Sequence, residues 1–237
     1  GLSVGKRMQQ AVMTGVSYMV PFVAAGGLLL ALGFLVGGYQ IGETTNGIDP
    51  WKQFATEYSF TNLPPTTVDF DGKEVAFAYP AFALYLGSVL FATGQAAMGF
   101  VVAALSGYIS YAMAGRPGIA PGFVGGAISV TLGAGFIGGL VTGLLSGAVA
   151  MWLGNQKVPK VLQSLMPVVI IPLGTSLVVG LVMFLLLGRP LAAILNGLQN
   201  WLTSMSGSSA LLLGVILGLM MCFDLGGPVN KAAYLFA

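Results

Sequence analysis

The sequence predicts an all-α integral membrane protein, a polytopic helical bundle with about six transmembrane helices. Of its 237 residues, 56% are hydrophobic and 7% are charged, and the mean hydropathy is +0.90; about 25% of residues are charged in an ordinary soluble domain. The long uncharged runs are residues 8–42, 75–115, 117–156, 161–188 and 190–223. Each is long enough for a span, which needs about 20 residues. These runs lack the alternation of a membrane β-barrel, so they must satisfy their backbone as helices.

The first span is predicted over residues 11–38, with glycines on one face at Gly26, Gly33 and Gly37. Residues 39–75 hold six of the seven acidic residues, together with Asn, Thr and a Pro-Pro pair. Charged side chains are costly in lipid. This segment is therefore predicted to be an exposed loop outside the hydrocarbon.

The next uncharged run, residues 75–115, is about twice the length of one span. It predicts two helices in a tight hairpin with the turn at Thr93–Gln95. The stretch "GRPGIAPGFVGG", residues 115–126, is rich in proline and glycine and predicts a non-helical segment. Irregular backbone is tolerated at membrane depth against other protein, so a re-entrant loop is expected there.

A fourth helix contains glycines every four residues, at Gly135, Gly139, Gly143 and Gly147. Small residues at this spacing let another helix approach closely. Helix packing, within or between subunits, is therefore the favoured interpretation of these glycines over a role in ligand binding.

A fifth helix is predicted over residues 161–187, where Pro167 and Pro172 are candidates for kinks. Residues 190–206 then alternate between an apolar face and a polar one. This spacing favours an amphipathic helix lying in the membrane interface, with Trp201 at the level of the headgroups. An ordinary buried helix is the alternative.

A sixth helix over residues 208–223 leads to Asp224 in the stretch "MCFDLGGPVNK". Its roughly 16 residues rise about 24 Å, less than the roughly 30 Å hydrocarbon core, so Asp224 is expected within the membrane. A carboxylate there costs about 2.5–3.5 kcal/mol on insertion scales and needs a cavity, a partner or a substrate.

Gly226, Gly227 and Pro228 interrupt the helix just beyond this carboxylate and free backbone groups, as in the broken helices of transport sites. Two interpretations stay open. Asp224 and Lys231 form a structural ion pair, with Asn230 as a helix cap. Alternatively, Asp224 accepts hydrogen bonds from the hydroxyls of a ligand while Asn230 and Lys231 donate. The candidate substrate-binding residues are Asp224, Gly226, Gly227, Asn230 and Lys231.

Other chemistry is not indicated. The chain has no histidine, and Cys222 is its single cysteine, so no catalytic nucleophile, metal site or redox pair is expected. No cofactor motif is found, and the net charge of +2 argues against a nucleic-acid partner.

The basic residues leave the orientation in the membrane nearly balanced. With a cytoplasmic N-terminus, Lys6, Arg7, Lys157 and Lys160 lie inside, and Lys52, Lys73, Arg116 and Arg189 lie outside. Pairs of basic residues at helix ends favour the cytoplasm, so a cytoplasmic N-terminus is expected.

Three segments carry a resemblance to a known family: "TGVSYMVPFVAAGGLLLALGF" (14–34), "GRPGIAPGFVGG" (115–126) and "FDLGGPVNKAAYLFA" (223–237). They resemble the fructose-type enzyme IIC, the membrane component of the bacterial phosphoenolpyruvate-dependent sugar phosphotransferase system. The resemblance implies import of fructose or a related hexose across the bacterial inner membrane. Phosphorylation would come from a separate IIB domain.

The resemblance also implies an organisation. Residues 1–188 would be scaffold helices that form a homodimer within the membrane lipid, residues 189–207 an interfacial connector, and residues 208–237 the start of an elevator-type transport domain. Asp224 falls where relatives place a sugar-contacting residue. The family continues into a Gly-Ile-Thr-Glu type motif, which the sequence does not reach by Ala237.

Two other functions remain as alternatives. In a proton-coupled secondary sugar transporter, Asp224 would take up a proton and Lys231 would balance its charge. A non-transporting membrane scaffold would account for the glycine-rich helix alone. The sequence does not choose among fructose, mannose and a mannosyl-glycerate.

Overall fold

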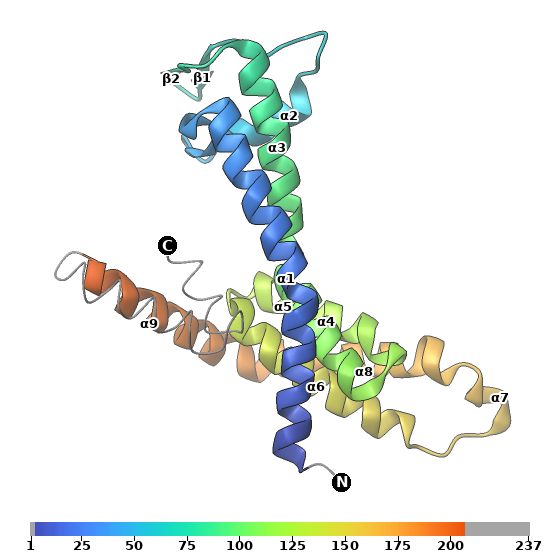
Figure 1. The fold of residues 1–237 in the computed structure, drawn as a ribbon. Helices are drawn as coiled ribbons and strands as arrows, with labels where there is room; N and C mark the ends of the chain where they lie inside the picture. The colour runs from blue at the N-terminus through green and yellow to red at the C-terminus, as the bar shows by residue number, and fades with distance from the viewer. Residues whose placement is uncertain (1–2, 207–237) are drawn as a thin grey trace. The chain divides into compact units, whose positions relative to one another are not determined.

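The computed structural model describes residues 3–206, and its helices and strands divide into two units (Figure 1). In order along the chain, the elements are α1 (Val4–Gly37), η1 (Tyr39–Gly42), α2 (Pro50–Glu57), β1 (Thr67–Phe70), β2 (Lys73–Ala76), α3 (Ala81–Gly99), α4 (Val101–Ala114), η2 (Arg116–Gly118), α5 (Ile119–Thr131), α6 (Gly135–Gly154), α7 (Lys160–Gln163), η3 (Met166–Ile170), α8 (Ile171–Val182), η4 (Met183–Leu187) and α9 (Gly188–Ser206). Unit 1 comprises residues up to Val20 and those from Val101 onward, and unit 2 comprises Pro21–Phe100.

The predicted fold class is confirmed: the protein is a helical membrane protein. In the described part of the chain, four helical stretches are long and apolar enough to cross a membrane. They are Val4–Gly37, Ala81–Ala114, Gly135–Gly154 and Met166–Ser204. The predicted sixth helix, residues 208–223, lies outside the described residues.

In unit 2, the second half of α1 packs antiparallel to α3 through glycines. A Cβ added at Gly33 would lie 2.8 Å from Phe91 Cβ and 2.9 Å from the carbonyl oxygen of Gly87. One at Gly94 would lie 2.8 Å from the amide nitrogen of Leu30. The two backbones therefore approach at distances that only glycine permits.

The segment predicted as an exposed loop, residues 39–75, is more ordered than expected. It contains η1, α2 and the antiparallel hairpin of β1 and β2, in which Val68 pairs with Val75. The hairpin turns at Asp71 and Gly72, whose φ angles are 49° and 93°, as a two-residue Asp-Gly turn requires. Apolar residues of the segment form a core with the start of α3. The buried members are Ile41, Phe54, Val68, Phe70, Phe77, Leu84 and Phe91.

The turn predicted at Thr93–Gln95 is wrong, because these residues lie inside α3. Only Phe100, whose φ of −93° and ψ of −4° remain in the right-handed helical region, separates α3 from α4. The run of residues 75–115 thus forms two helices, as predicted, but they meet at Phe100, and by length and composition they count together as one candidate span, Ala81–Ala114.

Unit 1 is built on α4, α5, α6 and α8 (Figure 1). The non-helical segment predicted at residues 115–126 is wrong, because η2 and α5 cover most of it. The prolines are tolerated because they fall near the starts of these helices, where backbone N–H groups lack intrahelical partners. Helix α5 has 13 residues and rises about 20 Å, short of the roughly 30 Å core.

Several glycines of α5 and α6 face α4. At Gly122 an added Cβ would lie 2.7 Å from Gly107 Cα, and at Gly126 it would lie 2.6 Å from Ala103 Cα. Gly139, Gly143 and Gly147 of α6 meet Val102, Ile109 and Met113 of α4 in that order, so α4 and α6 run parallel. Gly135 instead contacts Leu195 of α9.

The predicted fifth helix is present but irregular. The short helix α7 covers its first residues, then π-helical η3 contains Pro167, and π-helical η4 follows α8. Helix α9 confirms a helix over residues 190–206. Leu191 and Leu195 are buried on it, whereas Ile194 is 57% exposed and Trp201 is 51% exposed.

Candidate functional site

The predicted sugar-binding residues lie outside the described part of the chain. They are Asp224, Gly226, Gly227, Asn230 and Lys231. Cys222 lies outside it as well. Within residues 3–206 two other polar features stand out, one buried and one at the end of a helix bundle.

The buried feature is a group of hydroxyls between α4, α5 and α6. Ser106 Oγ and Thr142 Oγ1 share a hydrogen bond of 2.8 Å, and Ser129 Oγ lies 3.5 Å from Thr142 Oγ1. Ser129 also donates to the carbonyl oxygen of Gly125 at 2.9 Å, and Ser146 donates to that of Pro121 at 3.4 Å. All four side chains are fully buried, so these hydrogen bonds form at the contacts between helices, away from water.

Three further buried hydroxyls have no hydrogen-bond partner among the described residues: Ser88 in α3, Ser110 in α4 and Thr175 in α8. Ser110 lies four residues after Ser106 on the same face of α4. The sequence did not single these residues out. The usable signal was the four-residue spacing of small polar residues in apolar helices, Ser106 with Ser110 and Thr142 with Ser146.

The second feature is the distribution of charge. The described residues of unit 1 contain no aspartate or glutamate. Their basic residues are Lys6, Arg7, Arg116, Lys157, Lys160 and Arg189. Unit 2 has the opposite composition, since it holds Glu43, Asp49, Glu57, Asp69, Asp71 and Glu74 against Lys52 and Lys73.

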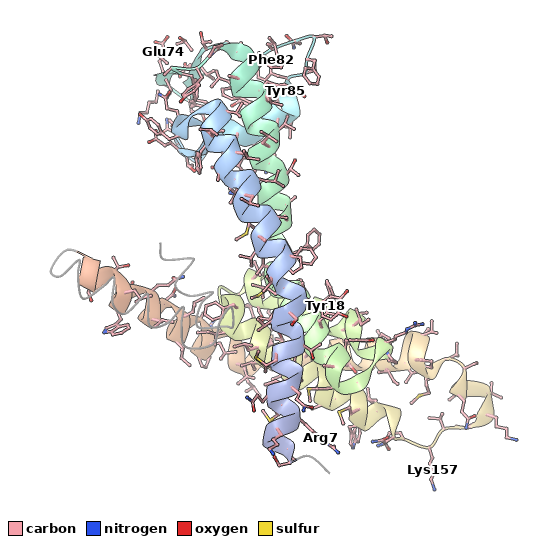
Figure 2. The ribbon with its side chains drawn as sticks, in the orientation of Figure 1. Arg7, Tyr18, Glu74, Phe82, Tyr85 and Lys157 are labelled. Atoms are coloured by element: carbon pink, nitrogen blue, oxygen red, sulfur yellow. The ribbon has the colours of Figure 1, made fainter. Side chains whose placement is uncertain are left out.

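Most of the unit 1 cations lie at one end of its bundle. The start of α1 lies beside the C-terminal turns of α4 and α6, because Arg7, Met113 and Met151 line the same cavity. Arg116 begins η2 shortly after α4 ends at Ala114. Lys157 lies in the connector after α6, which ends at Gly154 (Figure 2). The sequence assigned Arg116 to the side opposite Lys157; the parallel packing of α4 and α6 brings both to the same end.

Three cavities lined by described residues open at this basic end, one of which, of about 590 Å³, lies along the start of α1 and is lined by Lys6. Another, of about 670 Å³, lies between the start of α1, the end of α4 and the end of α6, with Arg7 as its charged residue. The third, of about 520 Å³, surrounds Lys157 in the connector after α6. Among residues 3–206 no group of three or more His, Cys, Asp or Glu side chains is placed to hold a metal ion.

These features define the class of the protein: a polytopic membrane protein whose described helices pack closely through glycines, bury hydroxyl groups between them and, in unit 1, carry a basic end. Comparison with known proteins gives the family. The family described as "Phosphotransferase system, EIIC" matches residues 13–237 of the chain. The chain belongs to this family of phosphotransferase-system membrane components.

Several relatives are similar over nearly the whole chain. The fructose-like permease IIC component 2 of Escherichia coli (strain K12) is 36% identical over 231 residues, which are 98% of this chain and 54% of that protein. The PTS system fructose-specific EIIC component of Haloferax volcanii is 35% identical over 249 residues, 97% of this chain and 57% of that protein.

A second Escherichia coli (strain K12) relative, the PTS system fructose-specific EIIB'BC component, is 42% identical over 225 residues, 94% of this chain and 33% of that protein. The chain thus spans about a third to a little over half of these relatives. No solved structure matches it.

Proposed function

We propose that the chain forms the first part of a sugar permease that carries fructose or a related hexose across the bacterial inner membrane, coupled to phosphorylation of the sugar. The observation that carries the proposal is the family match over residues 13–237 together with relatives named as fructose-specific or fructose-like IIC components. The phosphoryl donor is a IIB domain or protein. This partner is supported by relatives whose names join IIB to IIC, such as EIIB'BC.

The proposed sugar contacts are Asp224, Gly226, Gly227, Asn230 and Lys231. An acid expected at membrane depth beside a broken helix supports this role, because such groups usually face a substrate, a partner or a cavity. The proposed division of the chain is that of the family: scaffold helices over 1–188, a connector over 189–207 and the start of the transport domain over 208–237.

The test is Asp224→Asn in the full-length protein. This change keeps the size of the side chain but removes its charge, so uptake of radiolabelled fructose should fall at least about tenfold, the loss expected for a hydrogen bond to a charged group. Asp69→Asn in β1 is the matched control and should leave uptake unchanged. Wild-type uptake in Asp224→Asn would remove this residue from the site.

The energy source separates the permease from the alternative transporter. Uptake should require phosphoenolpyruvate and the phosphorylated IIB partner, and the sugar should appear inside as its phosphate. Uptake that follows a proton gradient and delivers unmodified sugar would favour proton-coupled transport. Isothermal titration that shows no sugar binding to the complete protein would favour a scaffold.

We infer further that the N-terminus is cytoplasmic, because Lys6, Arg7, Arg116, Lys157 and Lys160 share one end of unit 1 and basic residues favour the cytoplasmic side. In a Cys222→Ser background, a cysteine at Lys157 should resist an impermeant thiol reagent added outside cells, and one at Lys73 should react. The reverse pattern would invert the topology.

A homodimer is proposed from the family resemblance, and cross-linking of the intact protein in membranes tests it.

A further inference from the structure

Arg7 is a cation with no carboxylate among the described residues of its unit. It lies in the first turn of α1, and the described residues of unit 1 contain no acidic side chain. Lys6, Lys157 and Lys160 add positive charge at the same end of the bundle. An anion that neutralises Arg7 must therefore come from outside the described part of this unit.

Arg7 also lines the cavity of about 670 Å³ between the start of α1 and the C-terminal turns of α4 and α6. The walls have two characters. Gln10 and Tyr111 contribute polar groups beside Arg7, whereas Met8, Met113 and Met151 contribute apolar surface. The site thus pairs a charged, hydrogen-bonding region with a flexible apolar wall.

This combination matches the boundary of a lipid molecule. A guanidinium presents a planar fork of donors suited to two oxygens of a phosphate. Methionine side chains adapt to irregular apolar surfaces such as the start of an acyl chain. Basic pockets between transmembrane helices at the cytoplasmic surface are a known way of holding anionic headgroups.

We propose that this cavity binds one anionic phospholipid, with its phosphate on Arg7 and the upper part of an acyl chain against Met8, Met113 and Met151. A free phosphate ion would use Arg7 but would leave the methionine wall without a function. The bound lipid then fills the space between α1, α4 and α6 and fixes the start of α1 against the bundle.

The experiment uses the full-length protein in nanodiscs containing phosphatidylglycerol and phosphatidylcholine, with retained lipid counted by native mass spectrometry after mild release. Wild-type protein should retain one phosphatidylglycerol in preference to phosphatidylcholine. Arg7→Gln should weaken that retention about tenfold, the loss expected for a hydrogen bond between charged groups.

Two controls separate the cavity from general positive charge. Lys6→Gln removes a charge from the neighbouring position, which does not line the cavity. Arg189→Gln makes the same substitution as in Arg7→Gln but in the first turn of α9. Both should retain phosphatidylglycerol clearly better than Arg7→Gln does. Equal losses in all three variants would show unspecific attraction and overturn the proposal.

A second variant tests the apolar wall without changing charge. Ala112 is exposed and lines the cavity, so Ala112→Leu should fill part of it and reduce lipid retention while the protein stays monodisperse. Inorganic phosphate at millimolar concentration should not displace the lipid. Displacement by phosphate, or full retention in Ala112→Leu, would identify a simple anion site instead.

Discussion

Gly143 gives the sharpest test of how the helices of unit 1 are held together. It lies in the middle of α6 and faces α4. A Cβ at this position would lie 2.8 Å from Ile109 Cβ and 3.0 Å from the carbonyl oxygen of Ser106. Both neighbours are fixed to the backbone of α4, so no side-chain rotation relieves the contact. Gly143→Ala must push α4 and α6 apart.

The size of the effect follows from two opposing terms. Overpacking a tight contact costs about 1–3 kcal/mol, while replacing glycine by alanine inside a helix returns about 0.8–1 kcal/mol. The net loss for Gly143→Ala is therefore about 0–2 kcal/mol. Gly27 in α1 has no atom within 4 Å of an added Cβ, so Gly27→Ala should show the favourable term alone. The two variants should differ by about 1–3 kcal/mol.

The assay is thermal unfolding of the full-length protein in one detergent, followed by the loss of the monodisperse peak on size exclusion. Because 1 kcal/mol shifts the midpoint of a domain of this size by about 2–4 °C, Gly143→Ala should unfold at least about 2 °C below Gly27→Ala. Equal midpoints would refute close backbone packing between α4 and α6.

The remaining predictions concern buried hydroxyls and the loop core. Ser106→Ala should lower the same unfolding midpoint, because it breaks the 2.8 Å hydrogen bond to Thr142, and interhelical bonds of this kind contribute about 0.6 kcal/mol on average. Ser110→Ala removes a buried hydroxyl with no hydrogen-bond partner among the described residues, so it should be neutral or stabilising. A larger loss of stability in Ser110→Ala than in Ser106→Ala would contradict this assignment of hydrogen bonds. Phe54→Ala should lower the free energy of unfolding by about 3–5 kcal/mol and raise hydrogen exchange across residues 39–80, because Phe54 is fully buried. In the control Phe60→Ala, the side chain is 67% exposed, so hydrogen exchange over the same residues should stay unchanged.

Hydropathy predicted the fold class because the cost of exposing backbone to lipid leaves helices as the solution for long apolar runs. The same signal does not locate the breaks between helices. The run ending at Gly115 contains no charge, and Thr93–Gln95 looked like a turn by composition alone. Small residues, including polar ones, are tolerated inside membrane helices that pack closely. Gly94 is one such residue, because it contacts Leu30 of α1.

Glycine and proline were also misjudged around α5. In water these residues break helices, but here Gly122 and Gly126 are the contact points with α4. Their four-residue spacing is the same signal that singled out Gly139 and Gly143 in α6, and the prolines between Gly115 and Gly126 hid it. In residues 39–75, the many acidic residues concealed a small apolar core. The acids lie mostly on the surface of elements whose buried aromatic side chains form that core.

The fold, and not the sequence alone, shows which basic residues of unit 1 lie at the same end of its helices. Counting along the sequence places Arg116 one span away from Lys157, because every loop is assumed to alternate sides. Helix α5 has only 13 residues and returns beside α4, and α6 then runs parallel to α4. The ends of α4 and α6 coincide, so Arg116 joins Lys157 and Arg7 rather than opposing them. Within the described residues of unit 1, the cations therefore gather at one end, where they form a basic surface that an anionic lipid would neutralise.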